Sequence, residues 1–340
     1  MGLNSERYVE RLFQSLTNLD YPDYKLIFVD GGSTDRTLRM LKNYPVKVVH
    51  APGSKIAEAR NHGITSSKGA LVAFTDHDCT VDREWAKHLA CHILSDPLVG
   101  GAGGPNYIVD DGAAKSEAIT YVLGSWLGSA GSTQFFKYKN TRGVPAIPAC
   151  NMMFRREVLE EAGLFDQNLL YCEDGDICHR VTKLGYKVLY VPRAIVYHHL
   201  GLNSFKKMWT YFFSWGLGRT YEARKKKYLF SRTSLALLVG SLFMFTTAFL
   251  SFFNQLFLLT FMALTGAYFA TLLFSSLTLR MKAKRSIKLR YAFFAFLVEH
   301  IAYTLGLFFG LVAKRPLAYR LHNKQYVTRD KASAQRFGKK

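Results

Sequence analysis

The chain has 340 residues, enough for one or two domains, and a formal net charge of +20. Apolar residues make up 49% of it, but they are unevenly spread: the sequence is mixed as far as about Leu229, and the stretch that follows is almost wholly apolar. The excess positive charge gathers beside the apolar stretches, at 224–227, at 280–290 and from Lys314 onward. This placement favours a membrane surface over nucleic acid as the partner.

The five cysteines are scattered and form no C-x-x-C pair, so they do not describe a disulfide framework. We interpret them as reduced thiols facing the cytoplasm, mostly buried as small apolar side chains. A zinc site made of Cys172, Cys178 and His179 is the less favoured alternative. Residues 1–18 are polar with a helical pattern, so no signal peptide is expected there.

Helices and strands alternate over the first 75 residues. Apolar residues at helical spacing predict a helix over 6–16, and short apolar runs predict strands at 25–29, 46–50 and 70–75, with helices at 34–42 and 57–66 between them. Such alternation is typical of parallel βαβ units, which bind ligands beyond the carboxyl ends of their strands. Asp30 and the pair Asp76 and Asp78 follow two of these strands and predict a nucleotide site.

The remaining polar part is less regular. We expect a glycine-rich strand and turn at 99–107, short helices at 157–163 and 173–184, and a strand at 187–191. The aromatic and increasingly basic segment 205–227 is predicted to be an amphipathic helix on the membrane interface.

Three apolar segments, 234–253, 256–277 and 291–313, are long enough to span a membrane. The third carries Glu299 and His300, which are costly in lipid unless they are paired or face protein. Two or three spans therefore both remain open. We expect a multi-pass cell-membrane protein whose catalytic domain is cytoplasmic by the positive-inside rule. The expected domains are 1–204, the interfacial helix 205–232, the membrane domain 233–313 and a basic tail 314–340.

Two acidic clusters carry the candidate chemistry. Asp76-x-Asp78 leaves a predicted strand and offers hard oxygen ligands to Mg²⁺ or Mn²⁺, although a solvated turn is the ordinary alternative. Glu173-Asp174-x-Asp176 begins a predicted helix, where acidic residues are also favoured by the helix dipole alone.

These clusters belong to a longer ordered pattern. Its further members are Val29-Asp30-Gly31-Gly32-Ser33-Thr34-Asp35, Arg60-Asn61-x-Gly63, Gly163-Leu164-Phe165-Asp166 and the continuation of the second cluster through Arg180 to Gly185-Tyr186. Over roughly residues 3–199 the chain resembles the family 2 glycosyltransferases of GT-A fold. Within that family it is most similar in type to membrane-anchored enzymes that assemble polyprenyl- or dolichyl-linked glycans in archaea and bacteria.

The resemblance implies an α/β fold, a GT-A domain with a Rossmann-like, mostly parallel sheet, followed by C-terminal transmembrane helices. It implies a nucleotide-sugar donor bound by Asp30, Arg60, Asn61, Asp76 and Asp78. A divalent cation, Mg²⁺ or Mn²⁺, would be held by Asp76, Asp78 and His198 or His199.

The resemblance further implies that Asp174 is the catalytic base, with Glu173 shaping the acceptor site. Arg180 would orient the acidic cluster, and a purely structural ion pair is the equal alternative. The sugar and acceptor pocket would include Gly104, Asn151 and Asp176, with packing as the competing explanation for Gly104 and Asn151.

Two departures from the family pattern are visible. The family opens with a strand ending in asparagine, and this chain begins as though at the end of that strand, at Asn4, so we expect either a misassigned start or a missing strand. The Q-x-x-R-W motif of processive synthases is absent, which favours addition of one sugar or few.

Three functions remain in competition. The favoured one is an inverting, metal-dependent transferase that moves a sugar from a nucleotide to a lipid-linked acceptor. The alternative is a non-catalytic membrane scaffold with a degenerate nucleotide-binding fold. A nucleotidyltransferase is disfavoured because no glycine-rich, basic triphosphate loop is present.

Overall fold

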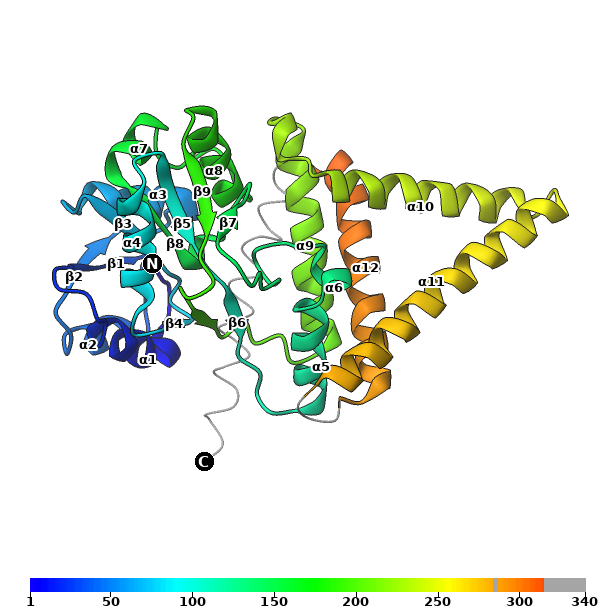
Figure 1. Ribbon diagram of the computed structural model, residues 1–340, viewed down its shortest axis with the longest axis horizontal. Helices are drawn as coiled ribbons and strands as arrows, with labels where there is room; N and C mark the ends of the chain where they lie inside the picture. Colours follow the sequence, from blue (N-terminus) through cyan, green and yellow to red (C-terminus); the bar gives the residue numbers. More distant parts are fainter. Residues whose placement is uncertain (284–286, 315–340) are drawn as a thin grey trace. The chain divides into compact units, whose positions relative to one another are not determined.

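The computed structural model describes residues 1–283 and 287–314, which divide into two compact units (Figure 1). The N-terminal unit comprises Met1–Val109 and Gly131–Leu200. The C-terminal unit comprises Asp110–Ala130 and the described residues from Gly201 onward. Residues 110–130 thus cluster with the C-terminal helices, although they lie inside the range 1–204 expected for one domain.

The N-terminal unit has alternating helices and strands along much of its length. Its elements are α1 Glu6–Thr17, β1 Leu26–Asp30, α2 Thr37–Leu41, β2 Val46–His50, α3 Ile56–Thr65, β3 Leu71–Phe74, β4 Cys79–Val81, α4 Trp85–Ser95, β5 Val99–Gly103, β6 Asn106–Ile108, β7 Arg142–Gly143, the 3₁₀ turn η1 Ala149–Asn151, β8 Met152–Arg155, α7 Arg156–Glu161, α8 Glu173–Lys183, β9 Lys187–Tyr190 and β10 Val196–His198.

The α/β fold class predicted from the sequence is confirmed, and the helices and strands expected over the first 75 residues are all present. The sheets, however, are mixed and not mostly parallel. The largest has the order β3-β8-β5-β9-β7, beside a three-stranded sheet β4-β10-β6 and a parallel pair β1-β2. The reason is β8, which inserts between β3 and β5 and runs antiparallel to both.

Helix α1 packs one apolar face into the core of the N-terminal unit. Val9, Leu12, Phe13 and Leu16 fall on one face at helical spacing, and all four are buried. They join a cluster that includes Trp85 and residues of β4, so the chain directly after the D-x-D segment is anchored by apolar packing. Because β3 and β4 flank that segment, the carboxylates at 76 and 78 are held between two fixed strands.

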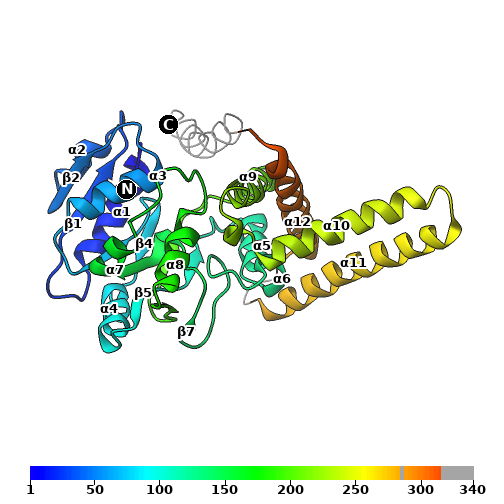
Figure 2. The same ribbon diagram turned by 90° about the horizontal axis from the view of Figure 1, so that it is seen from above.

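The C-terminal unit is helical throughout its described residues. Its elements are α5 Ala114–Leu123, α6 Trp126–Ser129, α9 Phe205–Ala223, the 3₁₀ turn η2 Lys227–Leu229, α10 Arg232–Leu250, α11 Gln255–Lys282 and α12 Leu289–Val312. Helices α10, α11 and α12 are each long and apolar enough to cross a membrane. Figures 1 and 2 show that α10 and α11 are joined by a short turn.

Helix α9 packs closely along α12. A Cβ atom added at Gly306 would lie 2.2 Å from the carbonyl oxygen of Phe213, and one added at Gly216 would lie 2.2 Å from that of Tyr303. Glycine is therefore required for the two backbones to approach this closely. The helix expected at 205–227 is present, shorter by one turn, and one face of it is covered by α12; its place on a membrane interface stays a prediction.

The two polar residues of the third apolar segment face protein. Glu299 is buried, and the ring of His300 lies 3.1 Å from the Tyr268 hydroxyl and 3.2 Å from the carbonyl oxygen of Leu127. This is the arrangement that ionisable residues require in an apolar segment.

Candidate active site

The D-x-D segment meets a histidine that lies far away in the sequence. Strand β10 pairs antiparallel with β4, with His198 opposite Cys79, and the His199 amide donates to the Asp78 carbonyl at 2.8 Å. As a result, Asp78 Oδ1 lies 3.2 Å from His198 Nε2. One ligand atom from each of Asp76, Asp78 and His198 lies within 4.8 Å of the others. The three residues predicted to hold a metal are thus brought together.

The donor set fits a divalent cation. Asp78 and His198 are buried, whereas the Asp76 side chain is 31% exposed and borders solvent. His198 Nε2 faces the Asp78 carboxylate at 3.2 Å, and the imidazole shares one small region with both carboxylates. Carboxylate oxygens and an imidazole nitrogen are ligands that divalent cations accept in proteins.

The charge on His198 is balanced by its neighbour. Burial opposes the charged imidazolium, but the carboxylate of Asp78 outweighs burial and raises the pKa of His198 well above its usual value. Without a cation, His198 and Asp78 therefore act as an ion pair. His199 behaves differently, because burial and the nearby Arg11 lower its pKa.

Arg60 connects the D-x-D segment to the second acidic cluster. Its guanidinium donates to the Glu173 carboxylate and lies 3.6 Å from Asp76 Oδ1. It also lies over the ring of Phe165, 5.6 Å from the ring centre. Burial alone would lower the pKa of Arg60, but Glu173 and Asp76 outweigh it and raise the pKa. Arg60 therefore stays charged while buried between carboxylates on two separate elements.

Asp174 follows Glu173 in the first turn of α8, at the helix end where backbone N–H groups favour negative charge. The Asp174 carboxylate accepts from the Gly175 amide at 2.7 Å and interacts electrostatically with Arg60. The preceding Cys172 has a left-handed backbone with φ of 59°, which turns the chain sharply into the helix. This turn presents Glu173 and Asp174 toward Arg60.

Asp30 ends β1 and is buried. Its carboxylate accepts from the amides of Gly32 at 3.1 Å and Ser33 at 3.2 Å, so it shapes the loop that follows. Gly2 pairs with Asp30, and a Cβ atom at Gly2 would lie 3.0 Å from Cβ of His77. Asp30 thus lies at the same edge as the D-x-D segment, and its contact with a nucleobase stays a prediction.

Asn61, predicted to bind donor, is used for structure. Its amide donates to the carbonyl of Phe165 at 2.8 Å and accepts from the Phe165 amide at 3.0 Å. Both ends of the side chain are therefore committed to one backbone residue. Asn61 thus holds the loop before α8 against α3, and its contact with the donor stays a prediction.

Asp176 and Arg180 form an ion pair within α8. Asp176 is completely buried, and its carboxylate accepts from Arg180 Nε at 2.9 Å and Nη2 at 2.7 Å. Arg180 also donates to the carbonyls of Ala162 and Leu164. These contacts favour the structural alternative for Arg180, and the place of Asp176 in an acceptor pocket stays a prediction.

Asn151 and Gly104 are likewise unavailable to a sugar. Asn151 is fully buried and accepts from Trp85 Nε1 while donating to the carbonyls of Pro105 and Ala194. A Cβ atom at Gly104 would lie 2.1 Å from the Ala194 carbonyl oxygen, so glycine is needed there for packing. The packing explanation holds for both residues.

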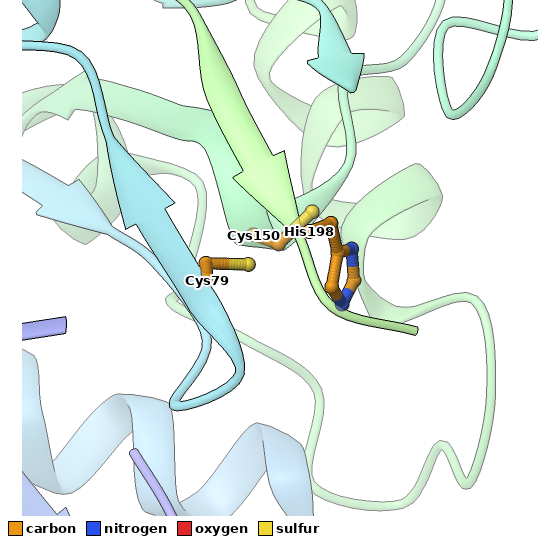
Figure 3. Close-up of side chains that lie close together, drawn as sticks. All are labelled: Cys79, Cys150 and His198. Atoms are coloured by element: carbon orange, nitrogen blue, oxygen red, sulfur yellow. The ribbon is translucent and has the colours of Figure 1, made fainter. Parts of the chain in front are cut away.

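Two cysteines that sequence reasoning did not connect with the site lie beside it. Cys79, directly after the D-x-D segment, and Cys150, in η1, point toward His198 (Figure 3). Their adjacency to Asp78 and Asn151 in the sequence is the signal that could have found them. The alternative zinc set at 172–179 is not among the metal-like groups of the described residues, and burial raises the pKa of Cys178 to about 12.

Comparisons with known proteins show the family and the fold of the N-terminal region. Residues 3–163 match the family model Glycosyl transferase family 2. A probable glycosyltransferase of Bacillus subtilis, YdaM, is 26% identical over 313 residues, covering 87% of this chain and 70% of that protein. The glycosyltransferase AglE of Haloferax volcanii is 23% identical over 203 residues, covering 57% of this chain and 64% of that protein.

A solved structure matches over most of the chain. The mannosyltransferase PcManGT of Pyrobaculum calidifontis, in complex with GDP-Man and Mn²⁺, superimposes with a TM-score of 0.60 at 17% identity. The match covers 91% of this chain and 85% of that one, and it shows a shared fold. The chain therefore carries a glycosyltransferase family 2 domain of GT-A fold, and it is a glycosyltransferase.

Proposed function

We propose that this protein is an inverting glycosyltransferase that moves a sugar from a nucleotide-sugar donor to a lipid-linked acceptor. The observation that carries the proposal is the convergence of two acidic clusters on Arg60. Asp76 lies on one side of the guanidinium and Glu173, next to Asp174, on the other. A site of this kind has one group of residues for a leaving diphosphate and another for the incoming hydroxyl.

The D-x-D side would hold the cation. Asp76, Asp78 and His198 offer two carboxylates and an imidazole, which suit Mn²⁺ or Mg²⁺. When bound, such a cation neutralises charge on a diphosphate leaving group. The part exposure of Asp76 leaves a side from which the diphosphate can approach.

Asp174 would be the general base. Where the acceptor is a hydroxyl, as on a lipid-linked glycan, its proton would pass to Asp174 as the oxygen bonds to the anomeric carbon and the bond to the diphosphate breaks. A polyprenyl phosphate is already largely ionised at neutral pH and would need no base. Glu173 cannot take this role easily, because its carboxylate is paired with Arg60. A single base and one displacement invert the anomeric configuration.

A lipid-linked acceptor, either a polyprenyl or dolichyl phosphate or a lipid-linked glycan, is favoured by the three apolar helices α10, α11 and α12. A membrane-held active site meets lipid-borne acceptors at a raised effective concentration. The basic run at 224–227 adds attraction to anionic lipid, and by the positive-inside rule it supports a cytoplasmic location for the catalytic unit.

The test uses the full chain in lipid nanodiscs, freed of metal by a chelator. A panel of UDP-, GDP- and dTDP-sugars is supplied with a long-chain polyprenyl phosphate or its short, water-soluble analogue. We expect transfer only when Mn²⁺ or Mg²⁺ is restored, with the long-chain acceptor preferred.

Three results would decide against this proposal or parts of it. A product whose NMR coupling constant shows retained configuration excludes the single-displacement mechanism. Equal use of long and short acceptors removes the support for a lipid-borne substrate. No turnover of any donor, with bound nucleotide still detected, would favour the non-catalytic scaffold.

A further inference from the structure

A second set of metal-ligating side chains lies beside the acidic cluster. Cys79 at the start of β4, Cys150 in η1 and His198 at the end of β10 come from three elements that are distant in the sequence. One ligand atom from each lies within 4.8 Å of the others. Figure 3 shows the Cys79 side chain directed toward Cys150, with the imidazole of His198 adjacent to Cys150.

The burial of this set is unusual for three polar side chains. Cys79 is 1% exposed, Cys150 is 2% exposed and His198 is 4% exposed. The Asp78 carboxylate lies beside this set, with its Oδ1 3.2 Å from His198 Nε2. Two buried thiols and an imidazole gathered from three separate elements are typical of a metal site.

Two thiols and an imidazole are the ligands that zinc prefers in proteins. Tetrahedral zinc, with bonds of roughly 2.3 Å to sulfur and 2.0 Å to nitrogen, places its ligand atoms about 4 Å or less apart. The observed group needs only a small inward movement to reach that spacing. Two thiolates would also cancel the charge of the divalent cation itself, which lowers the cost of burying it.

We propose that Cys79, Cys150 and His198 bind a thiophilic divalent cation of the Zn²⁺ class. Binding releases the two thiol protons to solvent and leaves the cation with two thiolates and a neutral imidazole. Asp78, 3.2 Å from His198 Nε2, is close enough to supply a fourth ligand or to orient the ring.

The shared histidine makes the two cation sites exclusive. A neutral imidazole has one nitrogen that carries a proton and one with a free lone pair, so His198 serves one cation at a time. A cation held by the thiols therefore withdraws His198 from Asp76 and Asp78. Zn²⁺ would then inhibit transfer that depends on Mn²⁺ or Mg²⁺. This second step rests on the proposed function, whereas the binding site itself does not.

Binding is tested with Co²⁺ on the reduced, metal-free full chain, followed by the charge-transfer absorption between thiolate and cobalt. We expect a band that saturates at one equivalent. Cys79→Ser and Cys150→Ser should each weaken Co²⁺ binding at least about tenfold and diminish the band. Cys91→Ser, on the exposed face of α4, is the matched control and should leave both unchanged.

Each remaining outcome is informative. The proposed site is overturned if the cobalt band survives in both buried-cysteine variants or is absent from the wild type. A disulfide between Cys79 and Cys150 in protein prepared with reductant overturns it as well. Should Cys150→Ser unfold, Cys150→Ala with a melting curve replaces it. If the cobalt band forms but Zn²⁺ does not inhibit transfer, the cysteine site stands and the competition between the two cation sites is overturned. If no transfer occurs at all, the proposed function is contradicted, and the cobalt band still tests the cysteine site.

Discussion

Two buried side chains of the N-terminal unit, Asn151 and His198, differ in the partners that they contact. The amide of Asn151 makes three hydrogen bonds, to Trp85, Pro105 and Ala194. The imidazole of His198 lies 3.2 Å from the Asp78 carboxylate and shares a small region with Asp76. Buried polar groups are normally satisfied, so burial alone does not identify a functional residue. Several metal-ligating side chains gathered in one place do point to a ligand.

The same contrast separates the aspartates. Asp176 is held on one side by Arg180 and has no exposed surface, whereas Asp78 shares its place with Asp76 and His198. Like charges close together are unfavourable unless a cation lies between them. We therefore propose that the pair Asp176 and Arg180 stabilises the fold and that Asp78, with its neighbours, takes part in the chemistry.

The largest effect is expected from Asp78→Ala. Loss of one carboxylate from the D-x-D cluster should lower turnover by at least about a thousandfold, as in other sites where a charge that stabilises the leaving group is removed. The matched control is Asp23→Ala, an exposed aspartate outside the site. Transfer assays with saturating Mn²⁺ and a melting curve for each variant measure the effect. Full activity of Asp78→Ala would place the chemistry elsewhere.

Asp174→Asn should have the next largest effect. The amide keeps the shape of the side chain but cannot accept a proton, so kcat should fall about a hundredfold while the affinity for donor nucleotide stays near normal. Single-turnover kinetics and isothermal titration of the nucleotide separate the two quantities. If nucleotide binding is lost and bound donor still reacts at the normal rate, Asp174 is a binding residue.

Asn151→Ala should act on stability and not on turnover. The substitution leaves the Trp85 indole N–H and two backbone carbonyls without their partner, which should lower the free energy of unfolding by about 1–3 kcal/mol. Denaturant unfolding measures this loss, and activity assays at low temperature report turnover per folded molecule. A large fall in kcat with normal stability would restore Asn151 to the sugar pocket.

The smallest effect is expected from Arg180→Lys. A lysine keeps the charge beside Asp176 but cannot also reach the carbonyls of Ala162 and Leu164 with a planar fork. The expected loss is roughly 1 kcal/mol of stability with kcat unchanged. A change in the pH profile of kcat at unchanged melting temperature would instead show that Arg180 acts on the reacting groups.

Local pattern in the sequence was enough to predict much of this protein. Helical spacing at Val9, Leu12, Phe13 and Leu16 located α1, and short apolar runs located β1, β2 and β3. The length of the apolar segments located α10, α11 and α12. In each case the periodicity of burial is a property of neighbouring residues, so it can be recognised without knowledge of the fold.

Only the tertiary structure decided which residues meet. The insertion of β8 between β3 and β5 made the sheet mixed, and the register of β10 against β4 brought His198 to Asp78 and Cys79. Likewise, Asn61 and Asp176 match the family pattern, and only the structure pairs them with Phe165 and Arg180. Pairing between distant strands depends on how the whole core packs, and that information is absent from any single stretch of sequence.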